Sequence, residues 1–537
     1  MDQGVEVGEG DEQWAPFTET GEDARVAESS AMNSTQRKTL AAIRKRLRAK
    51  SWPEVRQVLD EVAEAGDVEI LAVLGGGLTI DAPGNLVIGE KSEVHRRIRA
   101  PLRSDAALLI ARMSGLLDAA TTLRLEPLTH LTDLSFLRSL KTLRELSVKE
   151  SPHPLDLSAL SELPGLRLLS LSLNQTEPSR HPLDLSILKQ LPQLEMLGLY
   201  CFRTLTQLSV LAALPDLRIL KMAYADALVD ISALKVVPKL TTLELYLLSA
   251  IRDFSPLSAL PALSTLSLYL CPLDDASVLG TLPSLEVLEL QDCAPDDLSI
   301  LQGHPRLRVL RLQGYCGDPS FIATLPALEQ LVLPRGPRLT TLAPVAPLHR
   351  LRTLNITDCV NLTDLSGLGQ LSGLTDLSLS GRQEWTDLSA LAGLIGLEKA
   401  WLLHWHTVTD ISAVAGMSKM KHLSLAVFDQ LVDLSALAGL SELQSLFLSC
   451  SPLTDLTPLA SLPALTHITL IACTTLQDVS PLAELPVLKS LSLNRCTGVG
   501  DVSMLAGMST LETVNLPGSR QVTGFEALRE AGIRVSR

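Results

Sequence analysis

The chain has 537 residues, of which 46% are hydrophobic but only 3% aromatic, and its formal net charge is −14. This length exceeds what one hydrophobic core usually organises, so we expect several domains or a repeat array with small aliphatic layers. The negative charge argues against a nucleic-acid-binding surface over most of the chain.

An acidic tail is predicted over residues 1–33. Nine acidic residues and one arginine occur in residues 1–30, a composition expected to be disordered. The tail has no apolar run, so we expect no secretory signal. Charge interrupts the apolar residues elsewhere, so no membrane span is expected. The eight cysteines form no CxxC pair, and together these features favour a reduced, cytoplasmic protein.

A basic segment follows the tail. Leu40, Ile43 and Leu47 fall on one helical face, so the segment predicts an amphipathic helix. Seven like charges along one helix usually form a solvated face, and binding of nucleic acid or of an acidic membrane is the alternative. The seven cations are Arg37, Lys38, Arg44, Lys45, Arg46, Arg48 and Lys50.

Two further helices are predicted before residue 78. Ser51 and Glu54 have the spacing of a capping box, with Pro53 in the first turn. The stretch "DVEILAVLGGG" predicts another helix that ends at its glycines. Residues 34–118 are therefore expected to form a small helical domain, similar to a HEAT-like unit, that caps the array that follows or docks a partner. The apolar stripe of the helix after Ser51 consists of Val55, Val58, Leu59 and Val62.

A repeat fills residues 119–537, which we expect to end in a C-terminal cap. The phrase "LTDLS" or a close variant recurs, and its aspartate or the equivalent residue falls at 18 positions between 133 and 524. Of the 17 intervals, 12 are 23 residues long. The longest, from Asp156 to Asp184, contains an insertion around "NQTEPSRHP" that we expect to protrude. Such a period predicts a solenoid of about 18 repeats.

Each repeat has a strand pattern and a turn pattern. "LRTLNITDC" (351–359) shows the form LxxLxLxxC, whose consensus letters we number 1, 4, 6 and 9. The LxL alternation predicts a short strand with its leucines inside. A short turn or helix follows the anchor aspartate. This aspartate and the serine two places on are suited to bond the N–H groups where that turn starts.

The unit LxxLxLxxCxxLTDLSxLAxLPx resembles a leucine-rich repeat, most closely the 22-residue class of the internalins and of a protein phosphatase 1 regulatory subunit. The resemblance covers roughly residues 121–530. It implies an α/β solenoid, a curved horseshoe with a parallel β-sheet on its concave face, and a protein-binding role. It also implies that position 9 forms a buried ladder satisfying loop backbone groups. The cysteines at this position are Cys271, Cys293, Cys359, Cys473 and Cys496.

Tyrosines form the first candidate binding surface. Positions 3, 5, 7 and 8 are expected to line the concave sheet. Tyr200, Tyr246 and Tyr269 share position 7, and Tyr224 lies at position 8, so a contiguous ridge is expected. Exposed tyrosine and tryptophan side chains typically anchor protein interfaces. The alternative is that these rings only cover neighbouring apolar surface.

The second candidate surface surrounds "WLLHWH" (401–406). Trp401 and Phe447 occupy position 5, and His422 and His467 occupy position 3. His404 lies at position 8, beside Trp401 in the same repeat. Trp405 falls at position 9 and is expected to replace cysteine in the buried ladder, as Phe428 does one repeat later.

No convergent catalytic group is apparent, so we expect neither enzymatic activity nor a metal or cofactor. The preferred hypothesis is a non-enzymatic scaffold that binds a protein on the concave face. The alternative is a regulatory or sensor subunit, as in bacterial immune sensors and phosphatase regulators, whose N-terminal helices control an enzyme. The sequence predicts no oligomeric state.

Overall fold

The computed structural model describes residues 32–536 except residues 50, 76–77, 81–85, 89–102, 114, 126–133, 152–155, 174–184, 294, 296, 337, 381–384, 386–387, 450–451 and 519–521. Most of the predicted acidic tail, Lys50 and the insertion at 174–182 therefore lie outside the described residues. The chain divides into two compact units, Met1–Thr176 and Glu177–Arg537. The boundary falls inside the longest interval between anchors.

The first unit begins with helices. They are α2 (Ser34–Arg46), α3 (Trp52–Ala65), α4 (Val68–Gly75) and α6 (Arg103–Met113). The first three match the predicted helices, whereas α6 and the antiparallel hairpin of β1 (Leu78–Ile80) and β2 (Leu86–Ile88) were not predicted. Helix α6 packs against α3 and α4. Among the described residues, no helix has the length and apolar character needed to cross a membrane.

The predicted apolar faces of α2 and α3 are buried. Leu40, Ile43 and Leu47 are each at most 8% exposed, so the amphipathic interpretation of the basic segment is confirmed. The predicted capping box at Ser51 is wrong, because its side chain makes no capping hydrogen bond. Pro53 occupies the second helical position and has no N–H, which removes one of the two donors that such a cap uses. A capping box exists instead on α2, between Asn33 and Gln36.

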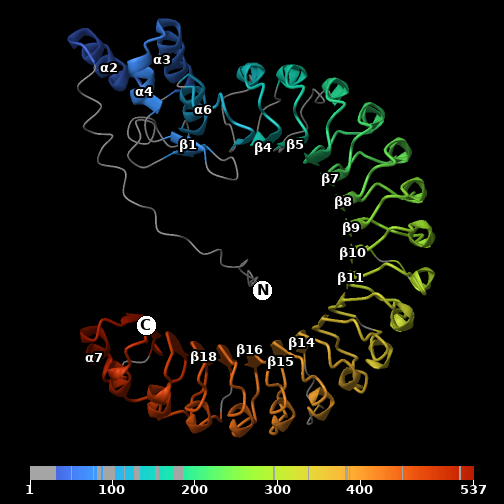
Figure 1. Cartoon of the computed structure of the whole chain (residues 1–537), viewed down its shortest axis with the longest axis vertical. Coiled ribbons are helices and arrows are strands. Elements are labelled where there is room, and N and C mark those ends of the chain that lie inside the picture. Colours follow the sequence, from blue (N-terminus) through green and yellow to red (C-terminus); the bar gives the residue numbers. More distant parts are fainter. Residues whose placement is uncertain are drawn as a thin grey trace. The chain divides into compact units, whose positions relative to one another are not determined.

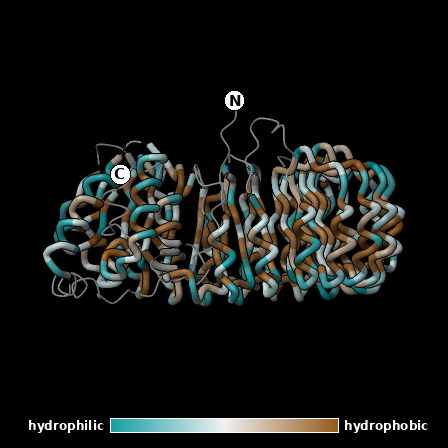
Figure 2. Tube along the Cα trace, turned by 90° about the horizontal axis from the view of Figure 1, so that it is seen from above, coloured by the Kyte–Doolittle hydropathy of each residue, from teal (hydrophilic) through white to brown (hydrophobic). Residues whose placement is uncertain are grey.

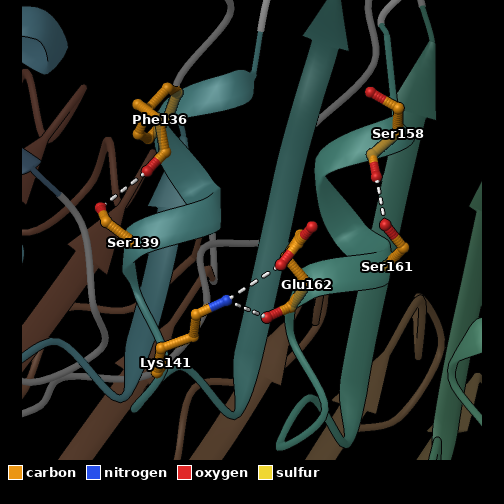
Figure 3. A network of polar contacts seen from close by, with 6 residues as sticks. All are labelled: Phe136, Ser139, Lys141, Ser158, Ser161 and Glu162. Atoms are coloured by element: carbon orange, nitrogen blue, oxygen red, sulfur yellow. Dashed lines mark hydrogen bonds and ion pairs between the residues drawn. The ribbon is translucent and has the colours of Figure 1, made fainter.

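The first unit ends in three repeats. Their parallel strands are β3 (Thr122–Leu125), β4 (Glu145–Ser151) and β5 (Leu168–Leu173). The turns between them are the 3-10 helices Ser135–Ser139 and Ser158–Glu162. Figure 3 shows how these two turns are fastened together: Lys141 Nζ donates to the Glu162 carbonyl oxygen at 2.8 Å. Within each turn a serine hydroxyl donates back to a carbonyl, Ser139 to Phe136 and Ser161 to Ser158.

The second unit is a run of parallel strands joined by 3-10 turns. Within this unit the strands line one side and the turns the other (Figure 1). The strands are β6 (Met196–Tyr200), β7 (Ile219–Ala223), β8 (Thr242–Tyr246), β9 (Thr265–Tyr269), β10 (Val287–Gln291), β11 (Val309–Gln313), β12 (Gln330–Val332), β13 (Thr353–Ile356), β14 (Asp376–Ser380), β15 (Lys399–Leu403), β16 (His422–Ala426), β17 (Ser445–Leu448), β18 (His467–Ile471), β19 (Ser490–Asn494), β20 (Thr513–Asn515) and β21 (Arg534–Ser536).

The turns on the opposite side recur once per repeat. They are Leu185–Gln190, Ser209–Ala213, Ser232–Val236, Ser255–Ala259, Ser277–Thr281, Ser299–Leu301, Pro319–Thr324, Ala343–Val345, Leu368–Gln370, Ser389–Leu391, Ser412–Val414, Ser435–Leu437, Thr457–Leu459, Ser480–Glu484 and Ser503–Gly507. Helix α7 (Phe525–Glu530) packs against the last of them, and β21 pairs with β20 at the C-terminal end.

The core is the layer of leucines between strands and turns. In β8, for example, Leu243 and Leu245 are buried while Glu244 between them is half-buried. The same alternation recurs from repeat to repeat as short apolar and polar segments along the trace (Figure 2). Parallel strands in register, an aliphatic core and regular 3-10 turns make up a leucine-rich-repeat solenoid. The predicted fold class is confirmed.

The anchor aspartates act as predicted. Asp253 Oδ1 accepts the backbone N–H of Ser255 at 2.8 Å, and the same bond recurs in other repeats, for example from Ser435 to Asp433. Thr341, which replaces aspartate at one anchor, makes the equivalent bond through its hydroxyl to the Ala343 N–H. Hydrogen bonds from the side chain and backbone of Ser255 lower the pKa of Asp253 below the usual aspartate value, and those from the backbone and side chain of Ser435 do the same for the pKa of Asp433.

Position 8 bends the chain out of the sheet. Among the residues that the structure describes, eleven other than glycine have positive φ, and all eleven occupy this position just beyond a strand. A left-handed backbone costs about 1–2 kcal/mol for an L-residue. The bend is held by an inter-repeat hydrogen bond: the Leu247 N–H donates to the Tyr269 carbonyl at 2.7 Å, and the Ala472 N–H to the Asn494 carbonyl at 2.9 Å.

Candidate functional site

The open face of the second unit's sheet presents its residues in rows. Strand registers pair position 5 with position 5 and position 7 with position 7 of the next repeat, as for Glu244↔Ser267 and Tyr246↔Tyr269. Positions 3, 5 and 7 therefore lie on the side opposite the leucine core. Position 8, also expected to line this sheet, lies directly after the strand, in the left-handed bend.

The predicted tyrosine ridge forms only in part. The rings of Tyr246 and Tyr269 lie with centroids 6.1 Å apart. Ala223 occupies position 7 on β7, between Tyr200 and Tyr246, and so interrupts the row. Tyr224 lies beyond β7 with φ 56° and is 42% exposed. Burial, followed by the charges of nearby glutamates, raises the pKa of Tyr246, which therefore remains a neutral phenol.

A row of ion pairs runs beside the tyrosines at position 5. Lys221 Nζ lies 2.9 Å from Glu244, and Arg311 pairs with Glu289. The Ser267 hydroxyl between these pairs donates to Glu289 at 2.9 Å. Sequence reasoning did not identify this row, although opposite charges at one position in neighbouring repeats were a detectable signal.

The second predicted cluster places its aromatic rings on alternate strands. Trp401 on β15 is 40% exposed, and Phe447 on β17 is half-buried. Ser424 on β16 is registered with both, so a small side chain separates the two rings. His404 directly follows β15, in the left-handed bend with φ 61°.

Two histidines flank this cluster at position 3. His422 on β16 is half-buried and His467 on β18 is exposed. Burial, together with the positive charges of Lys399 and Lys421 and the neighbouring His467, lowers the pKa of His422, while Asp376 opposes the shift. His422 is therefore neutral at neutral pH.

Trp405 belongs to the core, as predicted. It is 0% exposed and stacks on Phe428 with ring centroids 6.4 Å apart, and the ring centroid of Trp385 lies 5.1 Å from that of Trp405. His406 Nδ1 lies 2.6 Å from the Asp429 carboxylate. In the part of the chain that the structure describes, no group of three or more His, Cys, Asp or Glu side chains is placed to hold a metal ion.

The cysteine ladder is confirmed. Cys271 Sγ donates to the Leu245 carbonyl at 3.2 Å, and Cys359 Sγ to the Leu333 carbonyl at the same distance. Each bond reaches position 6 of the preceding repeat, so the thiols satisfy buried backbone oxygens. Burial raises the pKa of the Cys271 thiol to about 11, so it is a protonated donor.

The basic face of α2 is largely solvated. Arg37, Lys38, Lys45 and Arg48 are exposed. The guanidinium of Arg46 pairs with Glu61 on α3, and the bond between its second nitrogen and the Glu61 carboxylate is 2.8 Å long. Arg44 is half-buried. The predicted cations thus include one that fastens α2 to α3.

No family model and no curated protein matches the chain. Among solved structures, it is similar to an internalin (InlF) of Listeria monocytogenes, with 25% identity over 70% of this chain and 87% of that chain, at a TM-score of 0.35. A leucine-rich repeat protein of Leptospira interrogans is 17% identical over 80% of this chain and 98% of that chain, at a TM-score of 0.46. The functional domain of InlJ from Listeria monocytogenes, which includes a cysteine ladder, is 18% identical over 71% of this chain and 75% of that chain, at a TM-score of 0.37. The assignment of the fold therefore rests on the geometry of the repeats.

Proposed function

We propose that the chain is a non-enzymatic scaffold that binds a protein partner through the open face of the sheet in its second unit. The observation that carries the proposal is the placement of large aromatic side chains on that face, with Trp401 40% exposed. Tyr246 and Tyr269 pair on the same face. Rigid aromatic side chains with one free side are the usual anchors of protein interfaces.

The test uses two paired variants, Tyr246→Ala with Tyr269→Ala, and Trp401→Ala with Phe447→Ala. Capture of specific proteins from an extract of the native host, quantified by mass spectrometry, is expected to fall at least about ten-fold in one of them. Thermal midpoints should change little because these rings are partly solvated. Thr353→Ala with Ser378→Ala, on strands between the clusters, is the matched control. Undiminished capture by both aromatic variants would overturn the proposal.

The alternative, a regulatory or sensor subunit, is favoured by one feature of the first unit. A groove between α2, α3 and α4 is lined mainly by apolar atoms of Ala42, Ile43, Val58, Val62 and Ile70. It offers a docking surface separate from the sheet. Ala42→Arg would block it, and under this alternative a subset of captured proteins is lost while capture by the open face persists.

A further inference from the structure

Three consecutive repeats carry large apolar residues where the backbone is left-handed. Tyr224, Leu247 and Leu270 have φ values of 56°, 57° and 48°. In the next two repeats the same position holds Asp292 and Gly314, which are residue types that enter this region more readily. Backbone preference therefore does not account for the three apolar residues.

Core packing does not account for them either. Tyr224 is 42% and Leu270 38% exposed, and Leu247 is half-buried. Bulky apolar side chains are thus held in a strained backbone while much of their surface faces solvent. The bend itself recurs in other repeats, so these three residues are set apart by apolar surface that faces solvent in consecutive repeats.

These residues continue the tyrosine pair as one surface. The Tyr224 N–H donates to the Tyr246 carbonyl at 3.1 Å, and the Leu247 N–H to the Tyr269 carbonyl. Tyr224 and Leu247 therefore each lie beside the tyrosine of the following repeat. Leu270 directly follows Tyr269 in the chain, and its N–H donates to the Gln291 carbonyl. We name the surface of Tyr224, Tyr246, Leu247, Tyr269 and Leu270 the rim strip.

The loops that leave the rim strip are acidic. Residues 224–230, 247–253 and 270–275 contain five aspartates and one arginine. Arg252 lies 3.6 Å from Asp274, and Arg203 of the preceding repeat lies 3.9 Å from Asp226. The other three aspartates, Asp230, Asp253 and Asp275, are the anchors of their repeats. Hydrogen bonds from Ser232 and Ser277 hold the pKa values of Asp230 and Asp275 below the usual range, so these carboxylates stay charged. Negative charge here repels nucleic acid and anionic membranes and attracts a basic partner.

We propose that the rim strip binds a basic amphipathic helix of a protein partner, which rests on the proposed function and names the chemistry of its partner. Neighbouring repeats present their strip residues about 4.8 Å apart. A helix advances about 5.4 Å per turn. One turn of the partner helix therefore matches one repeat over the short length of the rim strip. The apolar residues of that helix would contact the rim strip, and its cations would face the aspartates.

The test exploits the left-handed backbone. Asparagine adopts positive φ more easily than leucine, so Leu247→Asn with Leu270→Asn removes the apolar ridge without unfolding the chain. Val427→Asn is the matched control, because Val427 has φ 62° at the same position outside the strip. The probe is a labelled helical peptide in which leucines recur every third or fourth residue and lysines fill the rest, titrated by fluorescence anisotropy.

Binding of the lysine peptide is expected to weaken at least about ten-fold in the double variant and to stay unchanged in the control. The double variant's thermal midpoint should stay level or rise. Equal binding by wild type and double variant, or equal binding of a peptide with glutamate in place of lysine, would overturn the inference. If the double variant still captures host proteins that the Tyr246→Ala, Tyr269→Ala variant loses, the left-handed leucines take no part in binding. The inference then fails while the scaffold function stands.

Discussion

The left-handed residue after each strand shows how one backbone requirement is met by many residue types. Ala472 has φ 55°, whereas Ala460, in a turn of the preceding repeat, has φ −58°. Ala472→Gly should raise the free energy of unfolding by about 0.5–1 kcal/mol, because glycine removes the left-handed penalty that exceeds its entropic cost. Ala460→Gly should lower it by a similar amount. Urea unfolding of both variants measures this, and the same sign for both would contradict it.

The thiols of the cysteine ladder should be unreactive toward alkylating reagents in the folded protein. Cys271 is buried, its Sγ is bonded to a carbonyl, and its pKa is raised to about 11, so almost no thiolate exists at pH 8. Cys316 is exposed. Alkylation with iodoacetamide at pH 8 should label Cys316 within minutes and Cys271 only after unfolding, as peptide mass spectrometry would show. Rapid native labelling of Cys271 would contradict the ladder assignment.

The residue numbering of the repeat predicted which side of the chain each aromatic faces, but not the bend. Trp401 and Trp405 were separated into exposed and buried residues because positions 5 and 9 follow from the LxL period. The sequence does not show that Tyr224 and His404 lie just beyond their strands in a left-handed bend, because a left-handed residue other than glycine leaves no mark in it.

At the scale of one repeat, the aromatic stack replaces the cysteine ladder. Trp405 packs against both Trp385 and Phe428. Trp405→Ala should cost about 3–5 kcal/mol, because it empties a large buried site. Trp401→Ala, in the same repeat but 40% exposed, should cost less than about 1 kcal/mol. Urea titrations followed by circular dichroism would distinguish the two, and equal losses would show that Trp405 is not a core element.

Helices of the first unit were predictable where an apolar stripe extends over several helical turns. Helices α2 and α3 have such stripes. The hairpin of β1 and β2 escaped prediction because each strand has only three residues, too few to establish an alternating period. The mistaken cap at Ser51 shows that the spacing of a capping box does not by itself set the side-chain geometry that its hydrogen bond needs.

Over the whole molecule, the fold was predictable because each repeat supplies the same strand, turn and anchor, so that errors in one repeat are corrected by the others. The binding surface was less predictable, since it depends on residues that do not repeat. The ion pair of Lys221 with Glu244 and the Ala223 gap in the tyrosine row emerge only when neighbouring strands are aligned.

The repeated anchors also predict how the molecule responds to acid. Hydrogen bonds from serine lower the folded-state pKa of anchors such as Asp230, Asp253 and Asp501 below the unfolded value. A lowered folded pKa stabilises the native state fully above the unfolded pKa, near 4, and this contribution is lost as the pH falls through the folded pKa. Each anchor contributes little, but they titrate together along one array.

The midpoint of urea unfolding should therefore be steady from pH 7 to about pH 5 and fall steeply below about pH 4. Asp253→Asn supplies the control, because its amide oxygen can still accept the Ser255 N–H but carries no titrating charge. This variant should be less stable than wild type at pH 7 and approach it at pH 3, since protonation removes the wild-type advantage. A difference between the two proteins that stays constant from pH 7 to pH 3 would show that the anchors stabilise the repeats by geometry alone, without their charge.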